Sequence, residues 1–357
     1  MPKSEPQFII PFAKPSGITS FTSLWQVKHT LGTKKVGHTG TLDSFADGLL
    51  VLLSGKLTKL VPYITDFDKT YRVLFYFGKE TDTLDPEGTV IAEKPLPVYA
   101  DFISAIRQLT GTIEQVPPVY SAVKQAGERL SDKIRRGEAV SVPPRTVTIY
   151  SIDIEEIFYA PEPDTNRENP EMSAVRKVLG VVLCVRCSKG TYIRSLVRDI
   201  AHRCGSAAYV YALRRTAVGP FTLEQAAGFS ALPPFGNAAA YTVNADSTDT
   251  PSDCADSAAV PHSVPDEAIK QAALPLSEAI ARAMHFQTAV LKEQYYAAFM
   301  NGKPISGHWF TSAQPLSDDG TAAVFYEGRC TGLMTKNGNR FHYQIVFNRG
   351  RVNASDA

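Results

Sequence analysis

The chain has 357 residues, of which 44% are hydrophobic and 20% are charged, the ordinary balance of a soluble globular protein. This length allows one large domain and a smaller one. No apolar run approaches the roughly 18 residues that a membrane helix needs. The opening residues MPKSEPQ also lack the charged-then-apolar order of a secretory signal. We therefore expect a cytoplasmic protein that does not associate with membranes.

The formal net charge of +1 averages over two unequal parts of the chain. Residues 241–267 hold six acidic side chains and no Lys or Arg, so the rest of the chain has 37 basic and 30 acidic residues. The stretch 186–215 has seven basic side chains and one acidic one, Asp199. Such a stretch is typical of a surface that faces phosphates, although charge alone would fit a solvated face almost as well.

Composition divides the chain into three regions. Residues 232–267 are mostly Ala, Ser, Thr, Asp and Pro, and cannot bury enough apolar surface to offset their ordering entropy. We expect a mobile linker there, between a large N-terminal domain at 1–231 and a C-terminal domain at 268–357. Alternating runs at 322–334 and 341–347 predict a small β-rich fold for the last region. It could bind RNA or only stabilise the rest of the protein.

The first region mixes helices and strands without regular alternation, which predicts an α+β fold. A helix is expected at 20–31, with Ser20 as its cap and Gly32 as its stop. Residues 71–78 then form a predicted strand, and the polar, proline-containing stretch 81–88 a turn.

A second strand–helix unit is expected further along. The apolar run 180–188 predicts a strand, the pair 189–190 breaks it, and Thr191 can cap a following helix. Arg194 and Arg198 lie four residues apart on one face of that helix. Another face has the apolar spacing of a core-facing helix, with Ile193, Leu196, Val197 and Ile200.

The segment GHTGTLDSFADGLL, at 37–50, is the first candidate for chemistry. Gly37 and Gly40 allow the backbone to approach a ligand closely, and Asp43 ends the loop before an apolar run. A lone aspartate in a loop is most often a turn or cap residue, so local chemistry leaves its role open. The segment is not a phosphate-binding P-loop, because the required GK[ST] ending is missing.

Two further side chains have both a structural and a functional interpretation. Tyr71 could belong to the core, or could offer its ring to a nucleotide base. Arg194 could be solvated. If it is buried beside Asp43, it would keep that carboxylate ionised through a bidentate ion pair.

The five cysteines predict neither disulfides nor a metal site. Their number is odd, and Cys184 and Cys187 should point to opposite faces of a strand. No second pair of ligands completes a tetrahedral zinc site. We expect no metal and no cofactor.

Four motifs together resemble one known family. Over about residues 8–228, the chain is similar to bacterial tRNA pseudouridine synthases of the TruB type. The motifs occur in the order of that family: GHTGTLDSFADGLL, KTYRV, QVPPVYSAVKQAGERL and CSKGTYIRSLVRDI. The resemblance implies a pseudouridine-synthase fold, with a mixed, largely antiparallel central sheet flanked by helices and a C-terminal PUA-like domain. It also implies isomerisation of uridine 55 in the tRNA T-loop, by a monomer that needs no cofactor or guide RNA.

The resemblance assigns roles to individual residues. It makes Asp43 the catalytic aspartate, Tyr71 a stacking and catalytic tyrosine, and Arg194 the buried arginine beside the aspartate. Three more positions match substrate-binding residues of the family: His38, Tyr192 and Leu213. The resemblance leaves open whether Asp43 attacks the sugar or removes its 2′ proton.

The chain departs from the family pattern next to the aspartate. Ser44 stands where the family usually has proline, and Asp47 adds a negative charge that could raise the pKa of Asp43. We expect Asp47 to point away. Two other functions remain: a non-catalytic RNA-binding protein on the same scaffold, and the same chemistry on a different or guide-directed RNA. The first is disfavoured because RNA binding alone does not require a carboxylate facing a polyanion.

Overall fold

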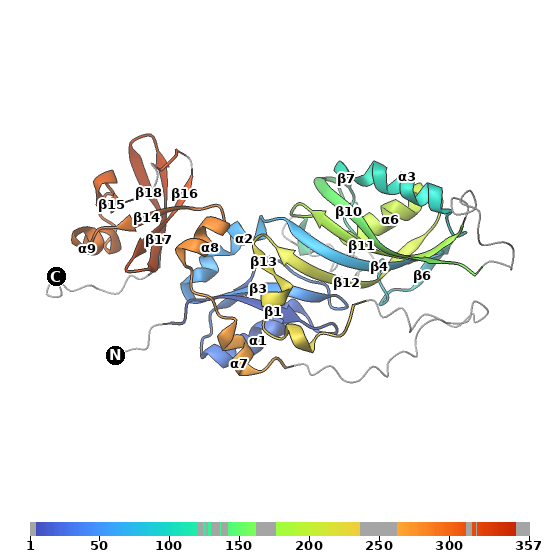
Figure 1. The fold of residues 1–357 in the computed structure, drawn as a ribbon, viewed down its shortest axis with the longest axis horizontal. Helices are drawn as coiled ribbons and strands as arrows, with labels where there is room; N and C mark the ends of the chain where they lie inside the picture. Colours follow the sequence, from blue (N-terminus) through green and yellow to red (C-terminus); the bar gives the residue numbers. More distant parts are fainter. Residues whose placement is uncertain are drawn as a thin grey trace.

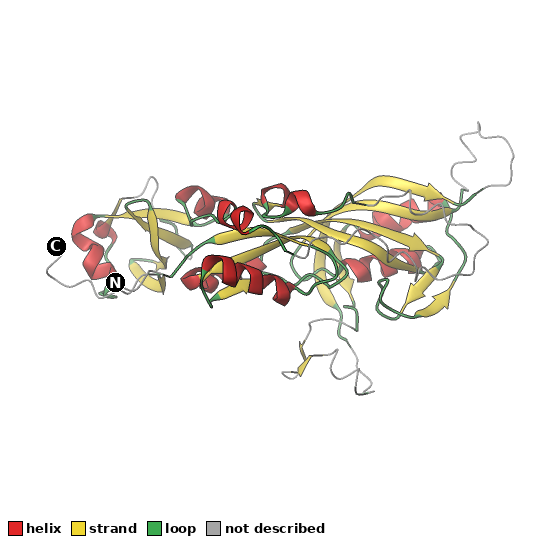
Figure 2. Cartoon of the chain, turned by 90° about the horizontal axis from the view of Figure 1, so that it is seen from below, coloured by secondary structure: helices red, strands yellow, loops and turns green. Residues whose placement is uncertain are grey.

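The computed structural model describes nine parts of the chain: residues 5–119, 124–125, 128–129, 136, 142–161, 176–235, 263–311, 316–318 and 320–347. Most of the predicted linker at 232–267 and part of the motif at 115–130 lie outside the described residues. Within them, two sheets follow one another along the molecule (Figures 1 and 2). No helix in the described part is long and apolar enough to cross a membrane.

The larger sheet has nine strands, in the order β1-β3-β12-β4-β11-β10-β7, with β2 paired to β3 and β13 paired to β12. All pairs are antiparallel except β3–β12. The expected mixed, largely antiparallel sheet is therefore confirmed. Its strands are β1 Ile9–Lys14, β2 Val36–His38, β3 Asp47–Ser54, β4 Lys69–Phe77, β7 Gly111–Gln115, β10 Arg145–Tyr159, β11 Val178–Cys187, β12 Ala208–Val218 and β13 Phe221–Thr222.

Helices and short hairpins complete this region. The helices are α1 Ser20–Leu31, η1 Gly55–Leu60, α2 Val61–Thr65, α3 Tyr99–Leu109, α6 Ile193–Arg203, η2 Leu223–Gln225 and η3 Phe229–Ala231. The hairpin strands are β5 Lys79–Thr81, β6 Val90–Glu93, β8 Lys124–Gln125 and β9 Glu128–Arg129.

Both expected helices of this region form, but the N-cap of each is a different residue from the one that the sequence predicted. The N-cap of α1 is Thr19, whose side chain accepts the Thr22 N–H, so the assignment to Ser20 was wrong. The expected stop is confirmed, since Gly32 adopts the left-handed conformation at φ 62°. The N-cap of α6 is Tyr192, which makes no side-chain cap, whereas Thr191 donates its hydroxyl to the Ser188 carbonyl.

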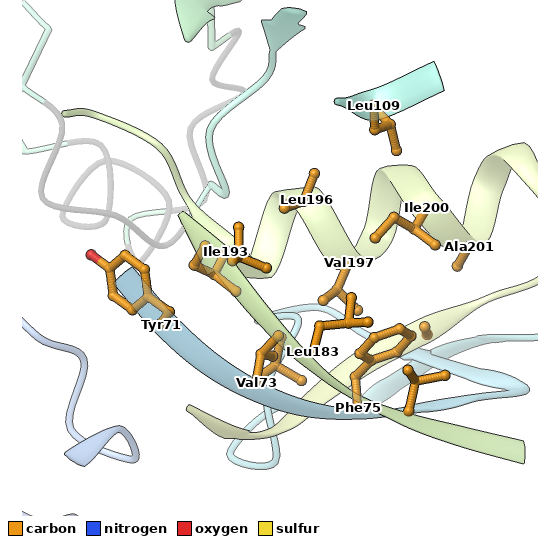
Figure 3. Close-up of a cluster of buried hydrophobic side chains, with 14 of the residues drawn as sticks. Tyr71, Val73, Phe75, Leu109, Leu183, Ile193, Leu196, Val197, Ile200 and Ala201 are labelled. Carbon is orange, nitrogen blue, oxygen red and sulfur yellow. The ribbon is translucent and has the colours of Figure 1, made fainter. Parts of the chain in front are cut away.

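Two helical layers cover different halves of one sheet face. α1 packs on the side chains of β1 and β3, including Phe12 and Leu50. α3 and α6 pack on β4 and β11. Figure 3 shows Ile193, Leu196 and Val197 of α6 above the β4 side chains, with Tyr71 at the edge of this cluster and its hydroxyl turned away.

The strand register shows that both layers lie on the same face. Gly48, two residues before Leu50, lies opposite Arg215, and Arg215 lies opposite Tyr71. Directly paired residues of neighbouring strands point to the same side of a sheet. The face that α1 covers on β3 is therefore the face that α6 covers on β4.

The smaller sheet is the expected C-terminal β-rich unit, with the order β15-β14-β16-β17-β18. Its strands are β14 Gln287–Leu291, β15 Phe310–Thr311, β16 Thr321–Tyr326, β17 Arg329–Asn337 and β18 Arg340–Val346. The helices of this part are α7 Asp266–Gln271, α8 Glu278–Ala283, η5 Glu293–Tyr295, α9 Tyr296–Met300 and η6 Gly307–Trp309.

The two sheets share buried apolar contacts. Leu49 and Leu53 of β3 belong to the same buried cluster as Phe325 and Phe347 of the C-terminal part. Val264 and Ile269, which lie on either side of the predicted boundary at 267, both pack with the residues beneath α1. The boundary itself stays a prediction.

Truncation of Phe75 should strongly destabilise the region that contains the larger sheet. Its side chain is fully buried beneath α6 and lies edge-on to Phe77, so Phe75→Ala leaves a cavity. We expect a loss of about 3–5 kcal/mol in the free energy of unfolding. Urea titration followed by circular dichroism measures it.

The matched control is Phe21→Ala, because the Phe21 side chain is 71% exposed. It should change the free energy of unfolding by about 0.5 kcal/mol or less. Equal losses in the two variants would contradict the assignment of Phe75 to the main core.

Candidate active site

A cavity of about 530 Å³ opens beside the start of α6 and the loop that precedes Asp43. Its wall is built from the 39–43 loop, the first residues of β4 and β10, the 188–192 turn, the start of α6, and β12. Five of the six predicted site residues line it: Asp43, Tyr71, Tyr192, Arg194 and Leu213. The fold thus brings together side chains that lie up to 170 positions apart in the sequence.

The guanidinium group of Arg194 bridges two carboxylates. Its Nε lies 2.9 Å from Oδ2 of Asp43, and its Nη1 lies 2.8 Å from Oδ2 of Asp85. Nη1 also donates to the Thr83 carbonyl at 2.7 Å. The side chains of Arg194 and Asp85 are 6% and 5% exposed, whereas that of Asp43 is 39% exposed. Arg194 is therefore a buried anchor, and Asp43 is the carboxylate that faces the cavity.

Asp85 is a site residue that the sequence interpretation missed. The sequence indicated only a turn at 81–88. In the structure, the Asp85 carboxylate accepts the Thr83 hydroxyl at 2.5 Å and the Glu87 N–H at 3.1 Å. Burial raises the pKa of Asp85, while these hydrogen bonds and Arg194 oppose that rise. Leu84, the residue between Thr83 and Asp85, has φ 62°, which is unfavourable for a leucine. This conformation turns the Thr83 carbonyl and the Asp85 carboxylate toward the Arg194 guanidinium.

Arg215 is the second missed residue. Its side chain is buried and donates to three backbone carbonyls, those of Leu49 at 2.8 Å, Gly40 at 3.1 Å and Thr41 at 3.5 Å. These bonds hold the glycine-rich loop that precedes Asp43 against β12. The signal in the sequence was the basic stretch 186–215, in which Arg215 is the last residue and which did not single it out from the other basic side chains.

The backbone after Asp43 is held from two directions. The buried Lys14 ammonium donates to the Ser44 carbonyl at 3.3 Å and to the Ile18 carbonyl at 2.7 Å, and burial lowers the pKa of Lys14 to about 8. The Ser44 hydroxyl lies 3.0 and 3.1 Å from the two carboxylate oxygens of Glu87. Ser44, which departs from the family pattern, therefore links the 39–44 loop to the turn that contains Asp85.

Asp47 points away from the cavity, as expected. Its carboxylate forms a bidentate pair with Arg214, at 2.7 Å from Nε and 2.6 Å from Nη2. Asp47 lies opposite Arg214 in the pairing of β3 with β12, and the next pair along these strands is Gly48 with Arg215. Their side chains therefore lie on the opposite face of the sheet. Arg214 neutralises the extra charge there.

His38 lies beside the cavity rather than in its lining. Its Nδ1 accepts the Gly40 N–H at 3.4 Å, and burial, assisted by Arg215, lowers its pKa. This hydrogen bond supports the loop conformation near Asp43. Whether His38 contacts the substrate stays a prediction.

The cavity wall is basic. It contains Asp43 as its acidic residue and five basic ones, Lys69, Arg145, Lys189, Arg194 and Arg215. This excess suits a polyanionic ligand, while the ring of Tyr71 and the side chain of Leu213 supply apolar surface for a base. Among the described residues, no three His, Cys, Asp or Glu side chains gather as metal ligands would.

Comparisons with known proteins agree with this geometry. Residues 28–193 match the model of the N-terminal domain of TruB family pseudouridylate synthases. The chain is 43% identical to a tRNA pseudouridine synthase B of Treponema pallidum, covering 96% of this chain and 98% of that protein. It is 42% identical to the protein of the same name from Treponema denticola, covering 95% and 97% of the two chains.

A solved structure shows the same fold at low sequence identity. It is an H/ACA ribonucleoprotein bound to a substrate RNA that contains 2′-deoxyuridine, and one of its chains aligns with a TM-score of 0.60 at 20% identity. The alignment covers 97% of this chain and 86% of that one. The chain is more than 40% identical to the two Treponema proteins over nearly its whole length, and it has an aspartate–arginine pair in a basic cavity. The chain therefore belongs to the TruB family of pseudouridine synthases.

Proposed function

We propose that the protein converts uridine 55 in the T-loop of tRNA to pseudouridine, with Asp43 as the essential carboxylate. The observation that carries this proposal is the ion pair between Asp43 and the buried Arg194, in which the aspartate keeps its exposed side toward the cavity. The relatives named tRNA pseudouridine synthase B support tRNA as the substrate. We also propose that it acts as a monomer in the cytoplasm, without cofactor or guide RNA.

The cavity suits one extruded nucleotide. Its volume of about 530 Å³ is far too small for a folded RNA loop, so the target uridine has to leave its stack to reach Asp43. Extrusion costs a few kcal/mol, which contacts with an aromatic ring and an apolar wall can offset. We propose that Tyr71 and Leu213 supply these two surfaces, and that Tyr192 closes the side formed by the 188–192 turn.

The chemistry requires an ionised carboxylate beside the sugar. Asp43 either attacks C1′ or removes the 2′ proton, and in both routes the C1′–N1 bond breaks. The freed uracil rotates within the cavity and C5 bonds to C1′. In the first route this step breaks the C1′–Asp43 bond and releases the carboxylate, and in the second route C2′ regains the proton that Asp43 removed. The proton on C5 is then lost, and N1 gains one. Arg194 contributes by holding the Asp43 carboxylate in one orientation through their ion pair.

The alternative of a non-catalytic RNA-binding protein is less well supported. A carboxylate that faces the phosphates of RNA weakens binding, so a pure binder gains nothing from Asp43 at the cavity wall. A buried arginine held by two carboxylates is likewise an elaborate arrangement for simple electrostatic attraction.

The substitution Asp43→Asn should separate these two functions. It keeps the shape of the side chain and removes the charged oxygen, so turnover should fall by about a thousandfold or more. Affinity for tRNA should hold or rise because a negative charge near phosphates is lost. Tritium release from C5-labelled uridine in a T-arm stem-loop measures turnover, and filter binding measures affinity.

A turn or cap role for Asp43 gives the opposite result. Asn caps nearly as well as Asp, so stability would change by less than about 1 kcal/mol and activity would survive. Tritium release by the Asn variant at a tenth of the wild-type rate would remove Asp43 from the mechanism.

Arg194→Lys should be far from conservative. An ammonium group is a point donor and cannot reproduce the planar fork that reaches Asp43 and Asp85 together. We expect turnover to fall by about a hundredfold, with tRNA affinity changed only a few-fold, because the loss is in the positioning of Asp43.

The matched control is Arg198→Lys, one turn later on α6. Arg198 binds the Asp199 carboxylate and the Val116 carbonyl, away from Asp43. Its substitution should leave turnover near that of the wild type. If the two variants behaved alike, the bridge between the carboxylates would not be what Arg194 contributes.

The position of the modified uridine can be read directly from cellular tRNA. We expect pseudouridine at position 55 to disappear in cells that lack the gene and to return with the wild-type gene but not with Asp43→Asn. Chemical mapping of purified tRNA makes the measurement. Loss at another position with 55 intact would reassign the substrate site while leaving the isomerase activity in place.

A further inference from the structure

The outer face of α1 carries two large aromatic side chains that the fold leaves uncovered. Phe21 and Trp25 are each 71% exposed, more than any other large hydrophobic side chain in the described part of the chain. They lie four residues apart and therefore on the same side of the helix. The other side of α1 is buried through Leu24 and Val27. The core thus does not require aromatic residues at 21 and 25.

Each of these rings has a basic side chain against it. Lys28 Nζ lies 5.7 Å from the centre of the Phe21 ring. The His29 ring stacks on Trp25, with centroids 5.8 Å apart and planes 18° apart. We call Phe21, Trp25, Lys28 and His29 the α1 stripe. Its combination of aromatic faces and cations is the one that proteins use for single-stranded nucleic acid.

The surrounding sequence is positively charged. Residues 6–42 contain no acidic residue, and three of their four lysines, Lys28, Lys34 and Lys35, are not buried. Lys34 and Lys35, just beyond the end of α1, are exposed. The contact of α1 with an acidic side chain, Asp266 of α7, is made by Thr30 and does not involve the α1 stripe. An anion that approaches the stripe therefore meets attraction.

The stripe begins beside the cavity. Ser20, the first residue of α1, accepts the Leu42 N–H at 2.8 Å and donates to the Leu42 carbonyl at 3.1 Å. Leu42 lines the cavity next to Asp43. Because the first residue of α1 is bonded to the loop that lines the cavity, an RNA that inserts one nucleotide into the cavity has α1 beside it. From Phe21 to Trp25 is about 6 Å along the helix, roughly the spacing of two bases.

We propose that the α1 stripe is a contact surface for the substrate RNA outside the cavity. An unpaired base stacks on Trp25 or Phe21, and Lys28, with Lys34 and Lys35, contacts the neighbouring phosphates. This proposal rests on the proposed function. A second copy of this chain fits less well, since pairing the stripe with itself would bring like charges together, and lysine is depleted in protein–protein interface cores.

The chain offers a direct reporter for this contact. It has two tryptophans, the exposed Trp25 and the mostly buried Trp309, which stacks on Tyr295 in the C-terminal part. In a Trp309→Phe variant, all tryptophan fluorescence comes from Trp25. Titration with unmodified tRNA transcript should quench this emission and protect it from acrylamide, with the same midpoint as filter binding.

The functional counterpart is a pair of variants, Phe21→Ala and Trp25→Ala. One stacked base contributes about 1–3 kcal/mol, so KM and Kd for tRNA should rise by about fivefold or more in at least one variant. The effect should appear in KM far more than in kcat. Phe229→Ala is the control, because Phe229 is an exposed aromatic residue, 39% accessible, on η3.

The outcomes separate this inference from the proposed function. If the wild type modifies tRNA while Trp25 emission stays unchanged and both variants keep their KM, the stripe is not an RNA contact and the isomerase activity stands. If the wild type neither binds nor modifies tRNA, the proposed function is wrong, and the inference that rests on it is overturned with it. If Trp25 becomes protected with rising protein concentration in the absence of RNA, and sedimentation shows a dimer, the stripe is an interface between copies and the inference is overturned.

Discussion

The active site depends on one buried guanidinium group. Arg194 cannot lose its charge, and an unpaired charge in the protein interior would cost several kcal/mol. The fold supplies two carboxylates and a carbonyl to compensate it, and only one of these groups, Asp43, also faces the cavity. The same contacts that compensate the buried arginine therefore set the orientation of the carboxylate that faces the cavity. The stability of the buried charge and the orientation of Asp43 depend on one set of interactions.

The loop around Asp43 has no regular secondary structure, so its backbone groups need partners from elsewhere. Arg215 and Lys14 supply donors to its carbonyls on either side of the aspartate. Ser20 binds the Leu42 backbone, and Ser44 binds Glu87. Each bond comes from a different element of the sheet face or from the turn that holds Asp85. Such a loop can be glycine-rich enough for a ligand to approach and still hold a carboxylate in one place.

One face of the larger sheet carries both helices that approach the cavity. α6 delivers Arg194 into the cavity from one side, and α1 begins beside the cavity on the other. Basic residues lie on the cavity wall and at Lys28, Lys34 and Lys35, and the buried Asp85 is paired with Arg194. A polyanion that reaches the cavity meets five basic side chains there, with Asp43, which shares Arg194, as the acidic residue of the wall.

The sequence by itself determined the family, the α+β class, the aspartate and its arginine, and the stop of α1 at Gly32. These features follow from local signals, such as a glycine that can adopt the left-handed conformation, or from four motifs whose order can be read from the sequence without a structure. Only the tertiary structure decided that Arg194 is shared with Asp85 and that Arg215 holds the 39–43 loop. It also replaced Ser20 by Thr19 as the cap of α1, because the Ser20 hydroxyl is engaged by Leu42. The physical reason is the same in each case. These bonds join residues distant in sequence, and a buried polar group takes whichever partner the packed chain places within reach.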